Sequence, residues 1–183
     1  MKTKHYLASL FGCAVLAAAP AAFGTSFEPT TFGDNVAAAQ LSVIGEVENI
    51  RYERRNGSIV TITQYSVQFP GFGRAPAMIE VVTPGGRMQV GRFPVAEVVA
   101  DSPRTLMGQK SLLLLQRGDR FGEFRPVGLS QGVIPVATGR DGVERVMLPP
   151  SVGGPAGIRD SLRTVRQLRR SVRLDGADIR IDR

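Results

Sequence analysis

The sequence predicts a mainly β protein: a small, strongly twisted antiparallel barrel with a short helix before it and one amphipathic helix after it. The first observation is a run of four leucines, residues 112–115, flanked by Gly108 and Gly118. Such a run is too short for an independent helix and too apolar for an exposed strand, which indicates a strand covered on both faces. The second observation is a series of strand-like segments separated by glycine and proline turns.

Residues 1–24 are predicted to be a signal peptide. Lys2 and Lys4 precede an apolar run, and small residues follow it as far as Gly24. This order is typical of an export signal, and the run is shorter than the roughly 20 residues that span a bilayer. A lipoprotein signal ending at Cys13 is the alternative, although the apolar run continues past this cysteine. We therefore expect an exported protein, periplasmic or secreted.

Removal of this signal peptide would also remove His5 and Cys13, the only histidine and the only cysteine in the chain. The remaining residues could form no disulfide, no Cys or His zinc site and no nucleophile activated by histidine. We accordingly predict no catalytic residues, no metal site and no cofactor. The composition favours a protein that is not an enzyme.

The net charge of +7 belongs mostly to the two ends of the chain. Without Lys2 and Lys4 it becomes +5, and residues 25–150 carry 13 basic and 12 acidic side chains. Residues 151–183 hold eight arginines and four aspartates, so the tail is basic and the body is balanced. Because a high isoelectric point alone does not indicate a nucleic-acid interface, nucleic acid is not the expected partner.

Residues 25–35 are expected to form a polar leader, followed by the barrel domain at 36–150. A short helix is predicted at 33–40, with Asp34 or Asn35 as its N-cap. The first strand is predicted at 41–52, with Gly45 marking a bend or a close approach of two backbones.

Asn56-Gly57 predicts a tight hairpin to a second strand at 58–69. In this second strand Val60 and Ile62 alternate in the opposite phase to Tyr65. The change of phase predicts a β-bulge near Thr63-Gln64, which would increase the twist that a small barrel needs.

The rest of the predicted domain alternates loops and strands. A loop at 70–76 and a strand at 78–83 lead to a Pro-Gly-Gly turn at 84–86. An irregular strand followed by a loop is expected at 87–103, before the leucine strand. A further strand and a final hairpin then complete the domain; the expected ranges are 123–129, 132–138 and 143–148.

The region 151–183 is predicted to contain a helix at 156–172 and a basic tail. Apolar residues fall on one stripe of this helix, at Ile158, Leu162, Val165, Leu168 and Val172, and arginines occupy much of the remainder. We expect the stripe to pack on the helix's own domain, because burying each aliphatic side chain stabilises by about 1.5–3 kcal/mol. A helix lying on a membrane surface is the alternative. Residues 174–183 are expected to be a short strand or a loose tail.

The order of several local motifs resembles a widespread group of uncharacterised bacterial exported proteins. The motifs are Val-Ile-Gly-Glu-Val at 43–47, a Thr-rich strand at 61–67, the turn at 84–86, Gly-x-x-Ser-Leu-Leu-Leu-Leu at 108–115 and Gly-Leu-x-Gln-Gly at 128–132. This chain departs from the group at Gln40, where an acidic residue is common. The resemblance implies a compact β-barrel similar to an oligonucleotide/oligosaccharide-binding (OB) fold, and it implies no substrate.

We expect this protein to bind or support another component of the cell envelope. The sequence does not identify that partner. One alternative is a nucleic-acid or glycan site on the barrel face, because such sites combine aromatic and basic side chains. The candidate residues for that site are Arg51, Tyr52, Arg54, Tyr65, Phe69 and Phe72. A barrel of the animal metalloprotease-inhibitor type is not favoured, because it depends on an amino-terminal cysteine in a disulfide.

A further alternative is a hydrolase that uses a pair of carboxylates. The acidic side chains available for it are Glu46, Glu48, Glu80, Asp101, Asp119 and Glu123. Lys110 and Ser111 are the only residues that could make a Ser-Lys pair, but adjacent residues of a strand point to opposite faces. No catalytic motif surrounds any of these residues.

Overall fold

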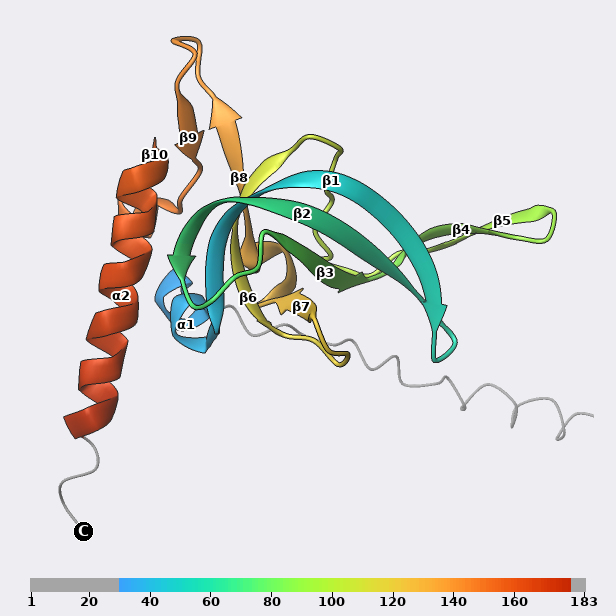
Figure 1. The fold of residues 1–183 in the computed structure, drawn as a ribbon, viewed down its shortest axis with the longest axis horizontal. Coiled ribbons are helices and arrows are strands. Elements are labelled where there is room, and N and C mark those ends of the chain that lie inside the picture. Colours follow the sequence, from blue (N-terminus) through green and yellow to red (C-terminus); the bar gives the residue numbers. More distant parts are fainter. Residues whose placement is uncertain (1–29, 179–183) are drawn as a thin grey trace, which may run out of the picture.

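The computed structural model describes residues 30–178, and the side chains of residues 30–171. This part of the chain is mainly β, with one short and one long α-helix (Figure 1). The predicted signal peptide, the first residues of the predicted leader and residues 179–183 lie outside the described residues.

The elements follow one another from a helix through a series of strands to a second helix. The helices are α1 (Phe32–Ala38), α2 (Ile158–Asp178) and two short 3-10 turns, η1 (Leu129–Gly132) and η2 (Pro150–Val152). The strands are β1 (Leu41–Arg55), β2 (Ser58–Phe72), β3 (Met78–Pro84), β4 (Gly86–Val90), β5 (Phe93–Glu97), β6 (Lys110–Arg117), β7 (Glu123–Pro126), β8 (Val133–Thr138), β9 (Glu144–Val146) and β10 (Ala156–Gly157).

The series of strand pairings begins and ends at β1. β1 pairs with β2, β2 with β3, β3 with β7, β7 with β6, and β6 again with β1. All of these pairs are antiparallel except β3 with β7. The sheet continues from β6 through β8 and β9 to β10, and β4 with β5 forms a separate two-stranded sheet.

The leucine strand β6 is covered on both faces, as predicted. Leu112, Leu113, Leu114 and Leu115 all have an exposed fraction of 0%. Leu113 and Leu115 pack on one side with residues of β1, β2 and β3, whereas Leu112 and Leu114 pack on the other side with residues of α1 and α2. The domain therefore has two apolar clusters separated by β1 and β6.

The short first helix begins earlier than predicted and has a different cap. Thr31 is the N-cap: its Oγ1 accepts a hydrogen bond from the Asp34 backbone N–H at 3.1 Å. The Asp34 carboxylate accepts from the Thr31 N–H at 2.9 Å, which completes a capping box. The predicted caps Asp34 and Asn35 are wrong, because both residues lie inside the helix. The predicted leader therefore contributes the first turn of α1.

The predicted β-bulge at Thr63-Gln64 is wrong, because the β2–β3 ladder is continuous through both residues. The extra residue lies in the partner strand. Val47 pairs with Tyr65 and Asn49 with Gln64, so Glu48 has no partner on β2. Ile62 and Tyr65 lie on opposite faces of β2 and are both buried, which explains the change of apolar phase without a bulge at Thr63-Gln64.

Gly45 makes the close approach that the sequence indicated. A Cβ at this position would lie 3.1 Å from the Tyr65 Cβ and 3.4 Å from a Leu113 methyl carbon. The Asn56-Gly57 hairpin is also confirmed, with Arg55 paired to Ser58 and both turn residues at positive φ. A type I′ turn requires such angles at both central positions.

Three predicted boundaries between strand and loop were wrong. β2 continues through Phe72 into the predicted loop at 70–76, because β1 supplies partners as far as Ser42. The region 87–103 contains a regular hairpin, β4–β5, in place of one irregular strand. The strand predicted at 123–129 ends at Pro126, and Leu129 instead begins η1.

Helix α2 packs on its own domain, as expected. Leu162 and Val165 are buried in the cluster that contains Phe32 and Val36 of α1. The part of the apolar stripe that the structure describes, Ile158 to Leu168, thus packs on the protein's own core. Val172, predicted to lie on this stripe, is outside the described side chains, and residues 174–178 are helical, contrary to the strand or loose tail predicted there.

Arginines of α2 also hold the helix against the sheet. Arg166 donates from Nε to the Gly71 carbonyl at 2.8 Å and from a terminal nitrogen to the Pro70 carbonyl at 2.9 Å. The Arg169 guanidinium donates to the Ala37 carbonyl at the end of α1 and lies 5.4 Å from the centre of the Phe72 ring. Within residues 30–178, neither helix has the length and apolar character needed to cross a membrane.

Truncation of the leucine row should reduce stability much more than the same change at an exposed leucine. Leu113→Ala removes a fully buried side chain and should lower the free energy of unfolding by about 2–5 kcal/mol. Leu106→Ala is the matched control: Leu106 is 72% exposed, and its loss should change stability by less than about 0.5 kcal/mol. Urea unfolding followed by circular dichroism measures both values, and equal losses would contradict the two-sided core.

Candidate functional site

The four aromatic candidates do not form one surface. Tyr65 is 1% exposed and lies in the core, where burial raises the pKa of its hydroxyl. Phe72 is partly buried beneath Arg169. Tyr52 and Phe69 are exposed but pair with Thr61 and Ile44 at different ends of the β1–β2 hairpin. The eight residues from Ile44 to Tyr52 correspond to about 25 Å of strand, too far for a shared stacking platform.

The two basic candidates make contacts within the chain. Arg51 donates two hydrogen bonds to the Glu80 carboxylate, at 2.7 and 2.9 Å. Arg54 donates from Nε to the Gly57 carbonyl at 3.3 Å, within its own hairpin turn. The arrangement of aromatic and basic groups that a nucleic-acid or glycan site on this face would need is therefore not assembled.

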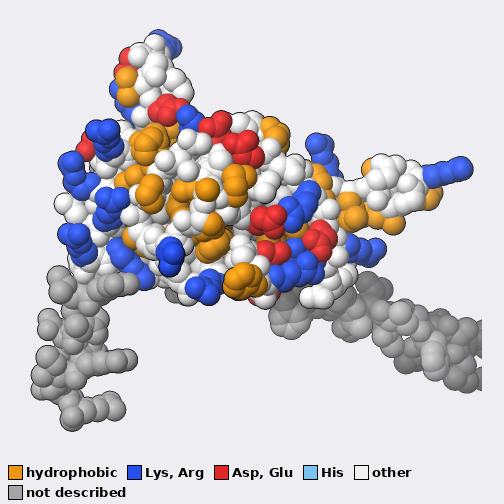
Figure 2. Space-filling model, in the orientation of Figure 1, with side chains coloured by type: hydrophobic (Ala, Val, Ile, Leu, Met, Phe, Trp, Pro, Cys, Tyr) orange, Lys and Arg blue, Asp and Glu red, His pale blue; other side chains and the backbone are white. Residues whose placement is uncertain are grey.

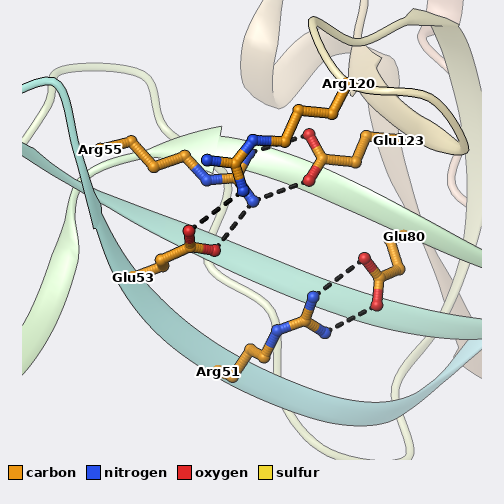
Figure 3. Close-up of polar contacts among 6 residues, drawn as sticks. All are labelled: Arg51, Glu53, Arg55, Glu80, Arg120 and Glu123. Carbon is orange, nitrogen blue, oxygen red and sulfur yellow. Dashed lines mark hydrogen bonds and ion pairs between the residues drawn. The ribbon is translucent and has the colours of Figure 1, made fainter.

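The Arg51–Glu80 pair lies beside a second set of ion pairs on the outer face of the sheet (Figure 3). Arg55 donates to both Glu123 oxygens, at 2.7 and 2.8 Å, and to Glu53 at 2.9 Å. Arg120 also donates to Glu53, at 3.1 Å. We use the term ion-pair network for these two neighbouring sets together: Arg51, Glu53, Arg55, Glu80, Arg120 and Glu123.

The ionised forms of these side chains stabilise one another. Hydrogen bonds from Arg51 hold the pKa of Glu80 below its ordinary value, and those from Arg55 do the same for the pKa of Glu53. Hydrogen bonds to Glu123 raise the pKa of the Arg55 guanidinium. The side chains of Arg55 and Glu123 are only 14% and 8% exposed, so this pair is nearly buried. A general acid needs a raised carboxyl pKa, and the shifts of Glu53 and Glu80 are in the opposite direction.

The remaining acidic candidates lie in separate contacts. Glu46 lies 4.0 Å from Lys110, and Glu48 accepts from the Ser66 hydroxyl at 2.7 Å. Asp101 accepts from the Ser130 hydroxyl, and Asp119 pairs with Arg125 at 3.3 Å. Glu80 and Glu123 are neighbours across the β3–β7 pair, but each carboxylate binds an arginine. The described residues contain no group of three or more possible metal ligands.

The possible Ser-Lys pair is also separated. Ser111 is completely buried in the sheet, whereas the Lys110 ammonium lies at the surface, 2.7 Å from the Glu144 carboxylate. The two side chains therefore point to opposite sides of β6, as strand geometry requires.

The most distinctive surface of the described chain is the two-stranded arm formed by β4 and β5, residues Gly86–Glu97 (Figure 1). Its register opposes Val90 to Phe93 and Met88 to Val95, so these four apolar side chains lie on one face. Phe93 is 75% exposed, and Val90 and Val95 are each 41% exposed. Figure 2 shows hydrophobic side chains on the projecting arm.

A cleft of about 660 Å³ opens at the root of this arm. Ile50, Tyr52 and Thr61 of the β1–β2 hairpin line one wall, and the segment 97–106 lines the other. The arm enters between them: at Gly86, with φ 145°, a Cβ would lie 2.6 Å from the Tyr52 ring. A side chain at this position would displace the tyrosine, so glycine is required here.

Hydrogen bonds hold the walls of the cleft in place. The Ile59 N–H donates to the Glu97 carboxylate at 2.6 Å, which fixes the end of β5 to β2. The Thr61 hydroxyl donates to the Gly85 carbonyl at 2.7 Å, and the Ser102 hydroxyl donates to the Pro84 carbonyl at the same distance. The cleft is therefore a fixed feature of the arm's root.

Sequence reasoning missed both the arm and the cleft. Pro94 and Gly91 made the region 87–103 look irregular, because proline is rare inside sheets. The available signal was the alternation of Met88 and Val90 before Gly91, and of Phe93 and Val95 after it. Proline is tolerated here because β5 is an edge strand of a two-stranded sheet.

Loss of the Glu123 carboxylate should destabilise the protein more than loss of the Glu80 carboxylate. Glu123→Gln leaves the nearly buried Arg55 without its main partner, and should cost about 3 kcal/mol in the free energy of unfolding. Glu80→Gln breaks a similar bidentate pair whose side chains are 44% and 32% exposed, and should cost less than about 1 kcal/mol. Chemical denaturation of the wild type and the two variants measures these losses in the free energy of unfolding. The reverse order would show that the Arg55–Glu123 pair is not the principal contact of the network.

The network should also make stability dependent on pH under acidic conditions. The pKa of Glu80 is lowered from 4.5 in the folded protein, so the folded state binds fewer protons than the unfolded state. This stabilisation is complete above the unfolded pKa and is lost as the pH falls through the folded value. The melting temperature of Glu80→Gln should therefore decrease less than that of the wild type between about pH 5 and pH 3. Parallel acid dependences would show that Glu80 does not contribute.

Comparison with known proteins assigns this chain to no family. No family model matches it, and neither a curated protein nor a solved structure does. The function proposed below rests on the residues and geometry of the chain itself.

Proposed function

We propose that this chain is a non-catalytic exported module that binds another protein of the bacterial cell envelope through the β4–β5 arm and the cleft at its root. The observation that carries the proposal is the apolar face of the arm, where Val90, Phe93 and Val95 are exposed together. Contiguous exposed apolar side chains mark interaction surfaces in soluble proteins.

The arm has a physical reason to bind a partner. A two-stranded hairpin is at best marginally stable alone, and beyond its root the arm is covered by no other element of the described chain. Burying an aliphatic or aromatic side chain stabilises by about 1.5–3 kcal/mol. A partner that covered Val90, Phe93 and Val95 would therefore stabilise both the complex and the conformation of the arm.

Three features support a passive role. Residues 25–183 contain no histidine and no cysteine. The acidic side chains that an acid/base pair would use are engaged with arginine, lysine or serine side chains. The pKa values of Glu53 and Glu80 are lowered, which favours permanent ion pairs over proton transfer.

We further propose that the body of the module is a small barrel of OB type. The series of pairings from β1 through β2, β3, β7 and β6 back to β1 supports this proposal. The OB fold is likewise a barrel of five strands. Such a closed body leaves few edges free and presents the arm as a projection. Export by cleavage near Gly24 accounts for the basic and apolar start of the sequence.

Disruption of the apolar face should remove a specific envelope contact. The matched pair of variants is Phe93→Glu on the arm and Phe121→Glu on the β6–β7 turn, where Phe121 is fully exposed. Cross-linking in intact cells, followed by purification of the chain, should give a discrete adduct with the wild type and Phe121→Glu. The adduct should be lost with Phe93→Glu, because a charge would have to be desolvated in the contact. An adduct retained in Phe93→Glu would contradict binding through the arm.

A further inference from the structure

We infer that the partner is a second copy of this chain, and that two copies exchange their arms so that the tip of each arm lies against the cleft of the other. The inference rests on the proposed function, in that it takes the arm as a docking surface. It goes further by assigning both sides of the contact to residues of this chain.

The position of the cleft relative to the arm is the geometric reason. Gly86 and Glu97 form the root of the arm and also line the cleft, whereas the tip lies at Gly91-Arg92. The two five-residue strands separate tip and root by about 17 Å. If two identical arms pack face to face and antiparallel about a two-fold axis, each tip is brought to the root of the other arm. That root is where the cleft opens.

The chemistry of tip and cleft is complementary. Phe93 is the most exposed apolar side chain of the arm, and the cleft offers Ile50, Tyr52, Val99 and Leu106 as apolar or aromatic contacts. An aromatic side chain inserted beside the Tyr52 ring would gain roughly 0.5–1.5 kcal/mol beyond the burial of its area. The insert and its receptor thus occur in the same chain, which is the condition for an isologous contact.

The cleft has no net charge that would oppose the tip. The tip carries Arg92, and the lining of the cleft holds two carboxylates, Glu97 and Asp101, and two arginines, Arg87 and Arg104. The proposed contact is therefore mainly apolar, and the single guanidinium at each tip can remain at its solvent-exposed edge.

The surface involved has the size that a stable dimer needs. The cleft lining has 17 residues, and the apolar face and tip of the arm add Met88, Val90, Gly91, Arg92, Phe93 and Val95. The total of about 23 residues of each copy lies within the roughly 20–30 residues per side of a standard interface. The apolar face and tip of the arm alone would contribute about a quarter of this number. Both the arm and the cleft are required for an interface of this size.

The distribution of polar residues on the arm favours a protein partner over a lipid surface. The tip ends in Arg92, and Arg87 and Gln89 lie on the face opposite Val90 and Phe93. Insertion of the tip into a bilayer would take a guanidinium into hydrocarbon, which is unfavourable by several kcal/mol. A face-to-face protein contact covers the apolar side and leaves the polar side in water.

Sedimentation equilibrium on the protein recovered from cells tests the proposal. We expect a reversible dimer in the micromolar range for the wild type and for Phe121→Glu. Phe93→Glu on the arm and Leu106→Glu on the cleft wall should each weaken dimerisation by roughly 30-fold or more, the loss expected at an interface hot spot. Both substituted side chains are more than 70% exposed in the single chain, so circular dichroism should show an unchanged fold.

Mixing the two variants provides a specific test of arm exchange. A mixed dimer of Phe93→Glu and Leu106→Glu retains one intact arm facing one intact cleft, while the other contact carries both substitutions. Because one charge already breaks the contact in which it lies, a second charge in the same contact should cost little more. The mixture should therefore associate more tightly than either variant alone and more weakly than the wild type. A mixture no tighter than the separate variants would overturn the exchange of arms.

The remaining outcomes separate this inference from the proposed function. A wild type that stays monomeric, together with an in-cell adduct that Phe93→Glu abolishes, would show that the arm binds a different protein. The second copy would then be wrong and the proposed function would stand. A monomeric wild type whose adduct is insensitive to Phe93→Glu would overturn both. A dimer that neither variant weakens would place the interface elsewhere and also overturn the inference.

Discussion

The structure depends on one constraint, the burial of the leucine row of β6 on both of its faces. A strand with apolar side chains on both faces exposes one of them to water unless both sides of its sheet are covered. The leucine strand therefore needs a packing layer on each face. Leu113 and Leu115 obtain it from β1, β2 and β3, and Leu112 and Leu114 obtain it from α1 and α2. The two helices are therefore part of the core. The arginines of α2 hold this helix against Gly71 and Ala37.

Away from the two helices, paired charged side chains cover the outer face of the sheet. Beyond the unpaired residue Glu48, the β1–β2 hairpin extends away from α1 and α2, and the ion-pair network lies on its outer face. The Arg51–Glu80 pair crosses β2 on the face that carries Ile62, which is completely buried. Arginine can cover apolar surface with its methylene groups while its charged end is paired. The charged residues of the hairpin are thus part of the packing and are poorly suited to bind a ligand.

Sequence reasoning succeeded where a signal is local and failed where it depends on distant residues. The leucine strand, the Asn56-Gly57 turn and helix α2 follow from a few adjacent residues and were predicted. The bulge was placed in the wrong strand, because the pattern of β2 does not show that Glu48, in its partner, is the extra residue. Arg55 and Glu123 are 68 positions apart, so nothing in the sequence near either residue indicates their pairing. Tyr65 was a candidate for a surface site for a similar reason, since its phase alone does not show which face of the strand is buried.

The arm differs from the rest of the chain in one physical respect. Its alternation of apolar and polar residues is as regular as that of β3, whose Ile79 and Val81 are buried in the core. In the arm, the same pattern faces solvent at Val90, Phe93 and Val95. In natural proteins local pattern and tertiary environment usually agree, and departures concentrate at functional sites. In the proposed function the cover for this apolar face comes from another molecule, and Gly86, packed against Tyr52, keeps the root of the arm beside the cleft. Each chain therefore carries both an uncovered apolar face on its arm and an open cleft at the root of the arm. Two copies can for this reason make the same contact with each other in both directions.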